Sequence, residues 1–127
     1  MSLKNINTAK APEAVGPYNQ AVIAGNMLFI SGQIALDPAT GELISGDVGA
    51  QTRQCMKNVL AILEEAGLDE KALARVGIYV TSMDNFALVN QVYASFFKGN
   101  YPARACVEVS GLPKGADVEI EAVALLG

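Results

Sequence analysis

The sequence contains no histidine, and only two of its 127 residues are cysteine. Without histidine, no Ser-His or Cys-His pair is available to activate a nucleophile. Two cysteines together with carboxylates form a poor ligand set for zinc, so a zinc site is not expected. Any chemistry must therefore depend on arginine, glutamate, tyrosine, serine, backbone groups and water.

Charged residues are also scarce, at 17% of the chain, and the lysines and arginines form no cluster. The formal net charge is −4, and the isoelectric point is about 4.7. A protein that binds nucleic acid is expected to present a basic surface to the phosphates. The composition therefore disfavours a nucleic-acid-binding role.

Long hydrophobic segments are absent as well. No run reaches the roughly 18 apolar residues that a membrane-spanning helix needs, and the first seven residues have neither the apolar centre nor the cleavage pattern of a signal peptide. Cys55 and Cys106 are too few for a disulfide framework. These features lead us to expect a cytoplasmic protein that binds no membrane.

The chain nevertheless is rich in apolar residues, which make up 51% of it, and its mean hydropathy is +0.29. Its length predicts one domain over residues 1–127. For one domain with no membrane span, this much apolar surface indicates burial between subunits. We therefore expect an oligomer.

Alternating apolar residues predict most of the strands. Residues 21–24 and 27–31 are expected to form a hairpin around a Gly25-Asn26 turn, with Gly32 directly after it. A clean alternation also predicts a strand at 75–81. Residues 4–7 and 42–44 are candidates for short strands.

Two segments have the apolar spacing of helices. The first is predicted over 48–66, with Asp47 as N-cap and Gly67 just beyond the end. The second is predicted to begin at Asp84 as N-cap and to end near residue 98, and its aromatic stripe is interpreted as core.

The last two strands carry the most distinctive side chains. Arg104 and Cys106 share one face of a strand at 101–109, and Glu119 and Glu121 share one face of the strand that begins at 117. If these two strands pair as a hairpin, the guanidinium, the thiol and a carboxylate lie together and form a candidate anion site. The alternative is an ordinary surface strand with an exposed arginine and a structural cysteine.

The predicted element order is that of an α+β domain with one mixed sheet and two helices on one face. The C-terminal half of the last strand is apolar on both faces, because Val123 and Leu125 follow the two glutamates. A strand of this kind needs cover on both sides. Two helices can cover one face only, so the other face is expected to meet another subunit.

Several segments together resemble the RidA family, the reactive intermediate deaminases, also called the YjgF group. The resemblance extends in order over nearly the whole chain, with Asn19 as a departure where many members have serine. The segments that carry it are Gly16-Pro-Tyr-Asn-Gln-Ala21, Leu28-Phe-Ile-Ser-Gly-Gln33, Ala50-Gln-Thr-Arg53, Asn58-Val-Leu-Ala-Ile-Leu63, Asn90-Gln-Val-Tyr93 with Phe96-Phe97, Tyr101-Pro-Ala-Arg-Ala-Cys106 and Val118-Glu-Ile-Glu-Ala122.

This resemblance implies a chorismate-mutase-like fold and a homotrimer with active sites at the subunit interfaces. It also implies hydrolysis of 2-imino acids and enamines, such as 2-iminobutanoate and 2-iminopropanoate, to 2-oxo acids and ammonia. The positions that match the family's site are Arg104 and Glu119 as catalytic residues, with a substrate-binding set comprising Tyr18, Ser31, Gly32, Asn90, Arg104 and Cys106.

In the mechanism that these residues allow, Arg104 binds the substrate carboxylate and Glu119 positions or deprotonates water. No cofactor or metal is required. Cys106 is interpreted as a wall of the pocket, with redox sensitivity as the alternative. Two other functions stay open, namely a trimer that binds 2-oxo acids or other small ligands without turnover, and an endoribonuclease or translation inhibitor.

Overall fold

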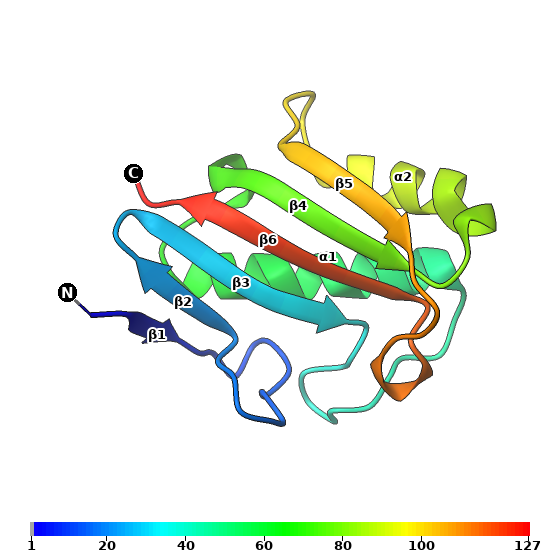
Figure 1. The fold of residues 1–127 in the computed structure, drawn as a ribbon, viewed down its shortest axis with the longest axis horizontal. Coiled ribbons are helices and arrows are strands. Elements are labelled where there is room, and N and C mark those ends of the chain that lie inside the picture. Colours follow the sequence, from blue (N-terminus) through cyan, green and yellow to red (C-terminus); the bar gives the residue numbers. More distant parts are fainter. Residues whose placement is uncertain (1) are drawn as a thin grey trace.

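The computed structural model describes residues 2–127, which form one six-stranded β-sheet with two α-helices behind it (Figure 1). The strands are β1 Lys4–Ile6, β2 Ala21–Ala24, β3 Met27–Ile34, β4 Leu73–Val80, β5 Ala103–Glu108 and β6 Val118–Leu125. Their order across the sheet is β1-β2-β3-β6-β4-β5. Only β4 and β5 run parallel, and the other neighbours are antiparallel. The predicted α+β class with a mixed sheet is confirmed.

The predicted hairpin is present between β2 and β3. Ala24 pairs with Met27 across the Gly25-Asn26 turn, and Gly25 has a φ of +62°, a left-handed conformation that glycine adopts without strain. The candidate strand at 42–44 is reduced to one isolated bridge between Leu36 and Leu43.

Helix α1, Val48–Glu65, lies within one residue of its predicted bounds. The Asp47 carboxylate accepts a hydrogen bond from the backbone N–H of Ala50 at 2.9 Å, which satisfies one free donor of the first turn. Its buried side chains, among them Cys55 and Val59, pack against the sheet.

The predicted bounds of the second helix are wrong at both ends. A 3₁₀ turn, η2 Met83–Asn85, comes first, and the Ser82 hydroxyl rather than Asp84 caps it. Helix α2 itself is Phe86–Ala94. After it the chain continues in tighter turns, whose hydrogen bonds span three residues instead of four, as far as Phe97.

The predicted hairpin between the last two strands is also wrong. β4 lies between β5 and β6 and pairs with both of them. The register places Arg104 opposite Val76, on the face that α1 and α2 cover, whereas Glu119 is opposite Tyr79 on the uncovered face. Both strands have the predicted alternation, but a pattern of period two does not specify which strand is the neighbour.

The two faces of the sheet differ in their cover. Inward side chains of β3, β4 and β6 form the core with α1, and fully buried Ile78 and Ile120 pair at its centre. The opposite face exposes a group of apolar side chains, here called the open-face patch: Met27, Phe29, Val107 and Leu125. Within residues 2–127, neither helix is long and apolar enough to cross a membrane.

Candidate active site

Arg104 lies on β5, and α2 holds its guanidinium from one side. The guanidinium carbon is 5.6 Å from the centroid of the Phe86 ring and 5.4 Å from that of Tyr93. Nη1 donates a hydrogen bond to Oδ1 of Asn90 at 2.5 Å. A guanidinium has five N–H donors, so these contacts orient the group and leave donors for an anion. The structure thus brings the predicted residues Arg104 and Asn90 together.

The aromatic partners of Arg104 were not predicted as site residues. Phe86 and Tyr93 were assigned to the core, and Tyr93 is indeed buried. The spacing of Phe86, Asn90 and Tyr93, four and then three residues, places all three on one helix face, and this signal was available in the sequence. Burial raises the pKa of Tyr93 to about 12, although Arg104 opposes the shift.

Cys106 follows Arg104 on the same face of β5 and is partly buried against the core. Burial raises the pKa of its thiol, and the charge of Arg104 opposes this effect without offsetting it. The thiol is therefore protonated at neutral pH and lacks the thiolate character that a neighbouring arginine can produce. This state disfavours a redox-sensitive thiol, and the role of Cys106 as a pocket wall stays a prediction.

Tyr18, Gly32 and Glu119 meet at a second place, a pocket of about 200 Å³ that Lys114 also lines. Glu119 lies on the uncovered face of β6. Burial, and secondly the charge of Glu121, raise the pKa of the Glu119 carboxyl. A carboxyl of this kind exchanges a proton more readily near neutral pH than an ordinary glutamate, which suits a general base.

A glycine at position 32 leaves space for the Glu119 carboxylate at this pocket. A Cβ atom there would lie 2.5 Å from Oε2 of Glu119. Only a residue without a side chain leaves room for the carboxylate in its present position. Gly32 does not follow the strand, as the sequence predicted, but lies within β3, where the register shifts between Ile30 and Gln33.

Ser31 is hydrogen-bonded to the protein backbone, whereas the family resemblance predicts that it binds substrate. Its hydroxyl donates a hydrogen bond to the carbonyl of Asn19 at 2.6 Å, and its N–H donates to the carbonyl of Gln20 at 2.9 Å. Ser31 does not line the pocket of Tyr18 and Glu119, but a neighbouring hollow. Through these bonds it supports the backbone that follows Tyr18.

The predicted residues therefore form two groups. Arg104, Cys106 and Asn90 lie on the helix-covered side, and Tyr18, Gly32 and Glu119 lie at the pocket on the other side. The carboxylate on the face of Arg104 is Glu108, and it accepts a hydrogen bond from the N–H of Met83 at 2.8 Å. Among residues 2–127, no three His, Cys, Asp or Glu side chains form a group that could hold a metal ion.

Comparison with known proteins gives consistent matches over nearly the whole chain. The sequence model of the family described as endoribonuclease L-PSP matches residues 8–126. A RutC family protein of Pyrococcus horikoshii is 51% identical over 94% of each chain. Human 2-iminobutanoate/2-iminopropanoate deaminase is 46% identical over 96% of this chain and 89% of its own. The structure of E. coli TdcF with bound serine has a TM-score of 0.93 and 44% identity, covering 98% of this chain and 99% of the other.

Proposed function

This chain belongs to the endoribonuclease L-PSP family, the RidA or YjgF family, and from this premise we propose that it hydrolyses 2-imino acids and their enamine tautomers. The substrates are small imino acids such as 2-iminobutanoate and 2-iminopropanoate. The products are the 2-oxo acid and ammonia. Four relatives, each 42–46% identical to this chain, carry the name of this deaminase.

The observation that carries the proposal is an arginine oriented to bind an anion, and a carboxyl of raised pKa at a pocket on the other face of the sheet adds to it. Arg104 is fixed by Asn90 and two rings and keeps donors for the substrate carboxylate. Glu119 is an acid–base group in a pocket that has space for a small molecule. The bound serine of the E. coli TdcF structure supports a ligand of the same size and charge pattern.

The reaction needs only these groups and water. The water oxygen adds to C2 of the imine while Glu119 accepts a proton from it. Glu119 returns this proton to the imine nitrogen, which gives the neutral carbinolamine. Glu119 then accepts the proton of the C2 hydroxyl and passes it to the amino nitrogen as the C–N bond breaks, so that ammonia leaves and the C2 oxygen becomes the new carbonyl. Binding of the carboxylate by Arg104 holds C2 in place for attack. One general base contributes about 10²- to 10⁴-fold in rate.

One subunit cannot supply both groups to one substrate, because Arg104 and Glu119 lie on opposite faces of its sheet. β5 is an edge strand, so the pocket of Glu119 on a second copy can approach Arg104 from outside. The open-face patch would be buried in the same contact. We therefore propose a homotrimer with one site at each interface, in the cytoplasm, where the free thiols Cys55 and Cys106 remain reduced.

A ligand-binding role without turnover is the second candidate, and the serine-bound relative is the observation that favours it. The test generates imine with a threonine or serine dehydratase and traps it with semicarbazide, in the presence of the wild type or of Arg104→Ala. We expect the wild type alone to divert imine from the trap. If neither protein changes the trapping rate, the deaminase proposal is wrong and the site only binds its ligand.

A further inference from the structure

The loop between β1 and β2 carries Tyr18, and the buried side chain of Gln20 lies beneath it. We propose that Gln20 is a positioning residue, whose amide clamps this loop and thereby holds Tyr18 at the pocket of Glu119. The catalytic part of this inference rests on the proposed function. The clamp itself is a property of the fold and can be tested without it.

The Gln20 side chain is 2% exposed, and both ends of its amide are engaged. Nε2 donates hydrogen bonds to the carbonyls of Thr8 at 3.0 Å, Ala11 at 3.2 Å and Pro12 at 2.8 Å. Oε1 accepts from the N–H of Thr8 at 2.7 Å. One side chain thus contacts four backbone groups, with the two Nε2 hydrogens shared among three carbonyls, at three positions of a loop with no regular secondary structure.

This arrangement requires an amide. A rotated amide, or a carboxylate, would place an oxygen against three carbonyl oxygens. An apolar side chain of the same size would leave buried carbonyls without a donor, which is a destabilising state. Gln20 is therefore specified by its hydrogen bonds and not only by its volume.

The backbone around Gln20 is held as well. Its N–H donates to Oδ1 of Asn7 at 3.0 Å, and its carbonyl accepts from the N–H of Ser31 at 2.9 Å. The Ser31 hydroxyl holds the carbonyl of Asn19. Tyr18 is 49% exposed, so neighbouring side chains hold its ring only in part. The position of this ring therefore depends on the backbone that Gln20 fixes.

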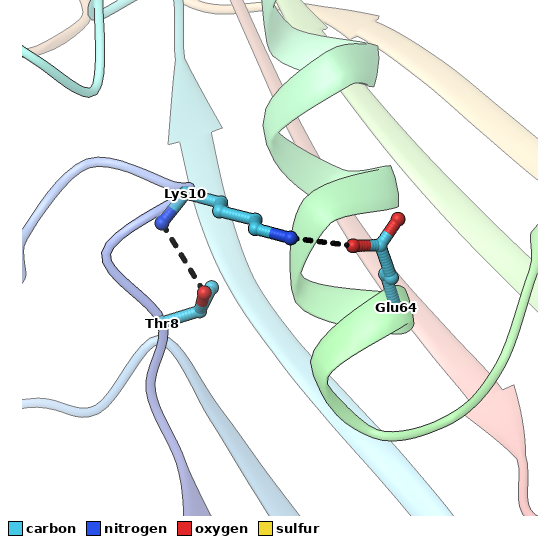
Figure 2. A network of polar contacts seen from close by, with 3 residues as sticks. All are labelled: Thr8, Lys10 and Glu64. Atoms are coloured by element: carbon cyan, nitrogen blue, oxygen red, sulfur yellow. Dashed lines mark hydrogen bonds and ion pairs between the residues drawn. The ribbon is translucent and has the colours of Figure 1, made fainter.

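A second tether of the same loop provides the contrast. Lys10 reaches across to α1, where its Nζ is 3.1 Å from Oε1 of Glu64, and its N–H donates to Oγ1 of Thr8 (Figure 2). Both side chains of this ion pair are largely exposed to solvent, at 73% and 68%. Such pairs contribute little to stability. The buried clamp, not the surface pair, is expected to hold the loop.

The first measurement compares amide hydrogen exchange at Tyr18 and Gln20 in the wild type, Gln20→Met and Lys10→Gln. We expect exchange about ten-fold faster in Gln20→Met and changed by less than about two-fold in Lys10→Gln. Asn7→Ala removes the bond to the Gln20 N–H and is the milder variant to use if Gln20→Met does not fold. Unchanged exchange in the Gln20 variant, or an equal change in the Lys10 variant, would overturn the clamp.

The second measurement is a double-mutant cycle on deaminase activity. Gln20→Met is expected to lower kcat/KM about ten-fold in the wild type and not at all when Tyr18→Ala is already present, because both changes act on one group. An equal loss in both backgrounds would mean a general structural role and would overturn the inference. If the wild type has no activity, the proposed function fails, and hydrogen exchange still decides whether the clamp exists.

Discussion

At the scale of single residues, Arg104 is placed by three contacts that a lysine could not reproduce together. Two rings lie beside the planar guanidinium, and Asn90 takes one of its hydrogens. A lysine ammonium is a point charge without a planar fork. The arrangement therefore suits the two oxygens of a carboxylate and not merely a negative charge.

The first prediction compares Arg104→Lys with Cys106→Ala. Arg104→Lys should lower kcat/KM by about 10- to 100-fold, the value of one or two charged hydrogen bonds. Cys106→Ala should retain most of the activity, because hydrolysis of an imine needs no thiol. Steady-state kinetics on enzymatically generated imine measures both, and comparable losses in the two variants would contradict these roles.

The second prediction concerns the raised pKa of Glu119. Folding favours the protonated form of this carboxyl, so its contribution to stability is complete below the unfolded pKa and is lost as pH rises through the folded pKa. Glu119→Gln removes the cost of the buried charge. The variant should therefore melt at a higher temperature than the wild type at about pH 8, with a difference that shrinks towards about pH 4.

Thermal unfolding at both pH values measures this difference, and imine trapping should show the same variant to be inactive. A variant less stable than the wild type at the higher pH would contradict the assignment of the pKa shift to burial. Glu121→Gln is the comparison on the neighbouring position, where the carboxylate accepts a hydrogen bond from the Tyr79 hydroxyl at 2.6 Å.

At the scale of elements, β6 places each of its two glutamates beside a glycine of a neighbouring strand. A Cβ atom at Gly32 of β3 would lie 2.5 Å from Oε2 of Glu119. A Cβ atom at Gly77 of β4 would lie 3.0 Å from Oε2 of Glu121. Gly32 and Gly77 therefore occupy equivalent positions beside a glutamate. Of the two, only Gly32 borders the pocket of Tyr18.

The third prediction uses this pair. Gly32→Ala should fold, because the displaced atoms are the end of a flexible side chain, but the Glu119 carboxylate would move by at least several tenths of an ångström. A displaced catalytic group can cost about 10²-fold in rate. Gly77→Ala disturbs Glu121 instead and should stay near wild-type activity. Similar kcat/KM values in the two variants would contradict the role of Gly32.

At the scale of the whole molecule, α1 and α2 cover one face of the sheet (Figure 1). The other face exposes the open-face patch. The two groups of site residues follow the same division. A contact between copies would cover the patch and bring Arg104 of one copy to Glu119 of the next. In a closed ring of copies, each subunit would contribute its Arg104 to one interface and its Glu119 to another.

The fourth prediction tests this assembly by mixing two inactive variants. Arg104→Ala and Glu119→Gln are co-expressed, and hybrid oligomers are isolated. In a hybrid trimer of either composition, one interface of the three combines a native arginine with a native glutamate. We therefore expect the isolated hybrids to have about a third of wild-type activity, whereas each variant alone stays inactive. No recovery in hybrids of confirmed composition would show that both residues act within one subunit, or that they do not share a site.

Local sequence pattern was sufficient to predict the period of most elements and some of their ends. The Gly25-Asn26 turn, the N-cap Asp47 and the alternation along β6 depend on neighbours in the chain, so local pattern was sufficient to predict them. The family resemblance also predicted the site residues that the structure places on the two sides of the sheet. The bounds of α2 were wrong, because the Ser82 cap and the tighter turns after Ala94 have weak local signals.

The choice of neighbouring elements depends on contacts between distant parts of the chain, which the sequence pattern does not reveal. Insertion of β4 between β5 and β6 placed Arg104 and Glu119 on opposite faces, since strand order arises from packing between distant segments. The same packing turned Phe86 and Tyr93 toward the guanidinium and buried Gln20 under its loop. Alternation along a strand determines which of its residues share a face. Packing between distant segments determines which other elements contact that face.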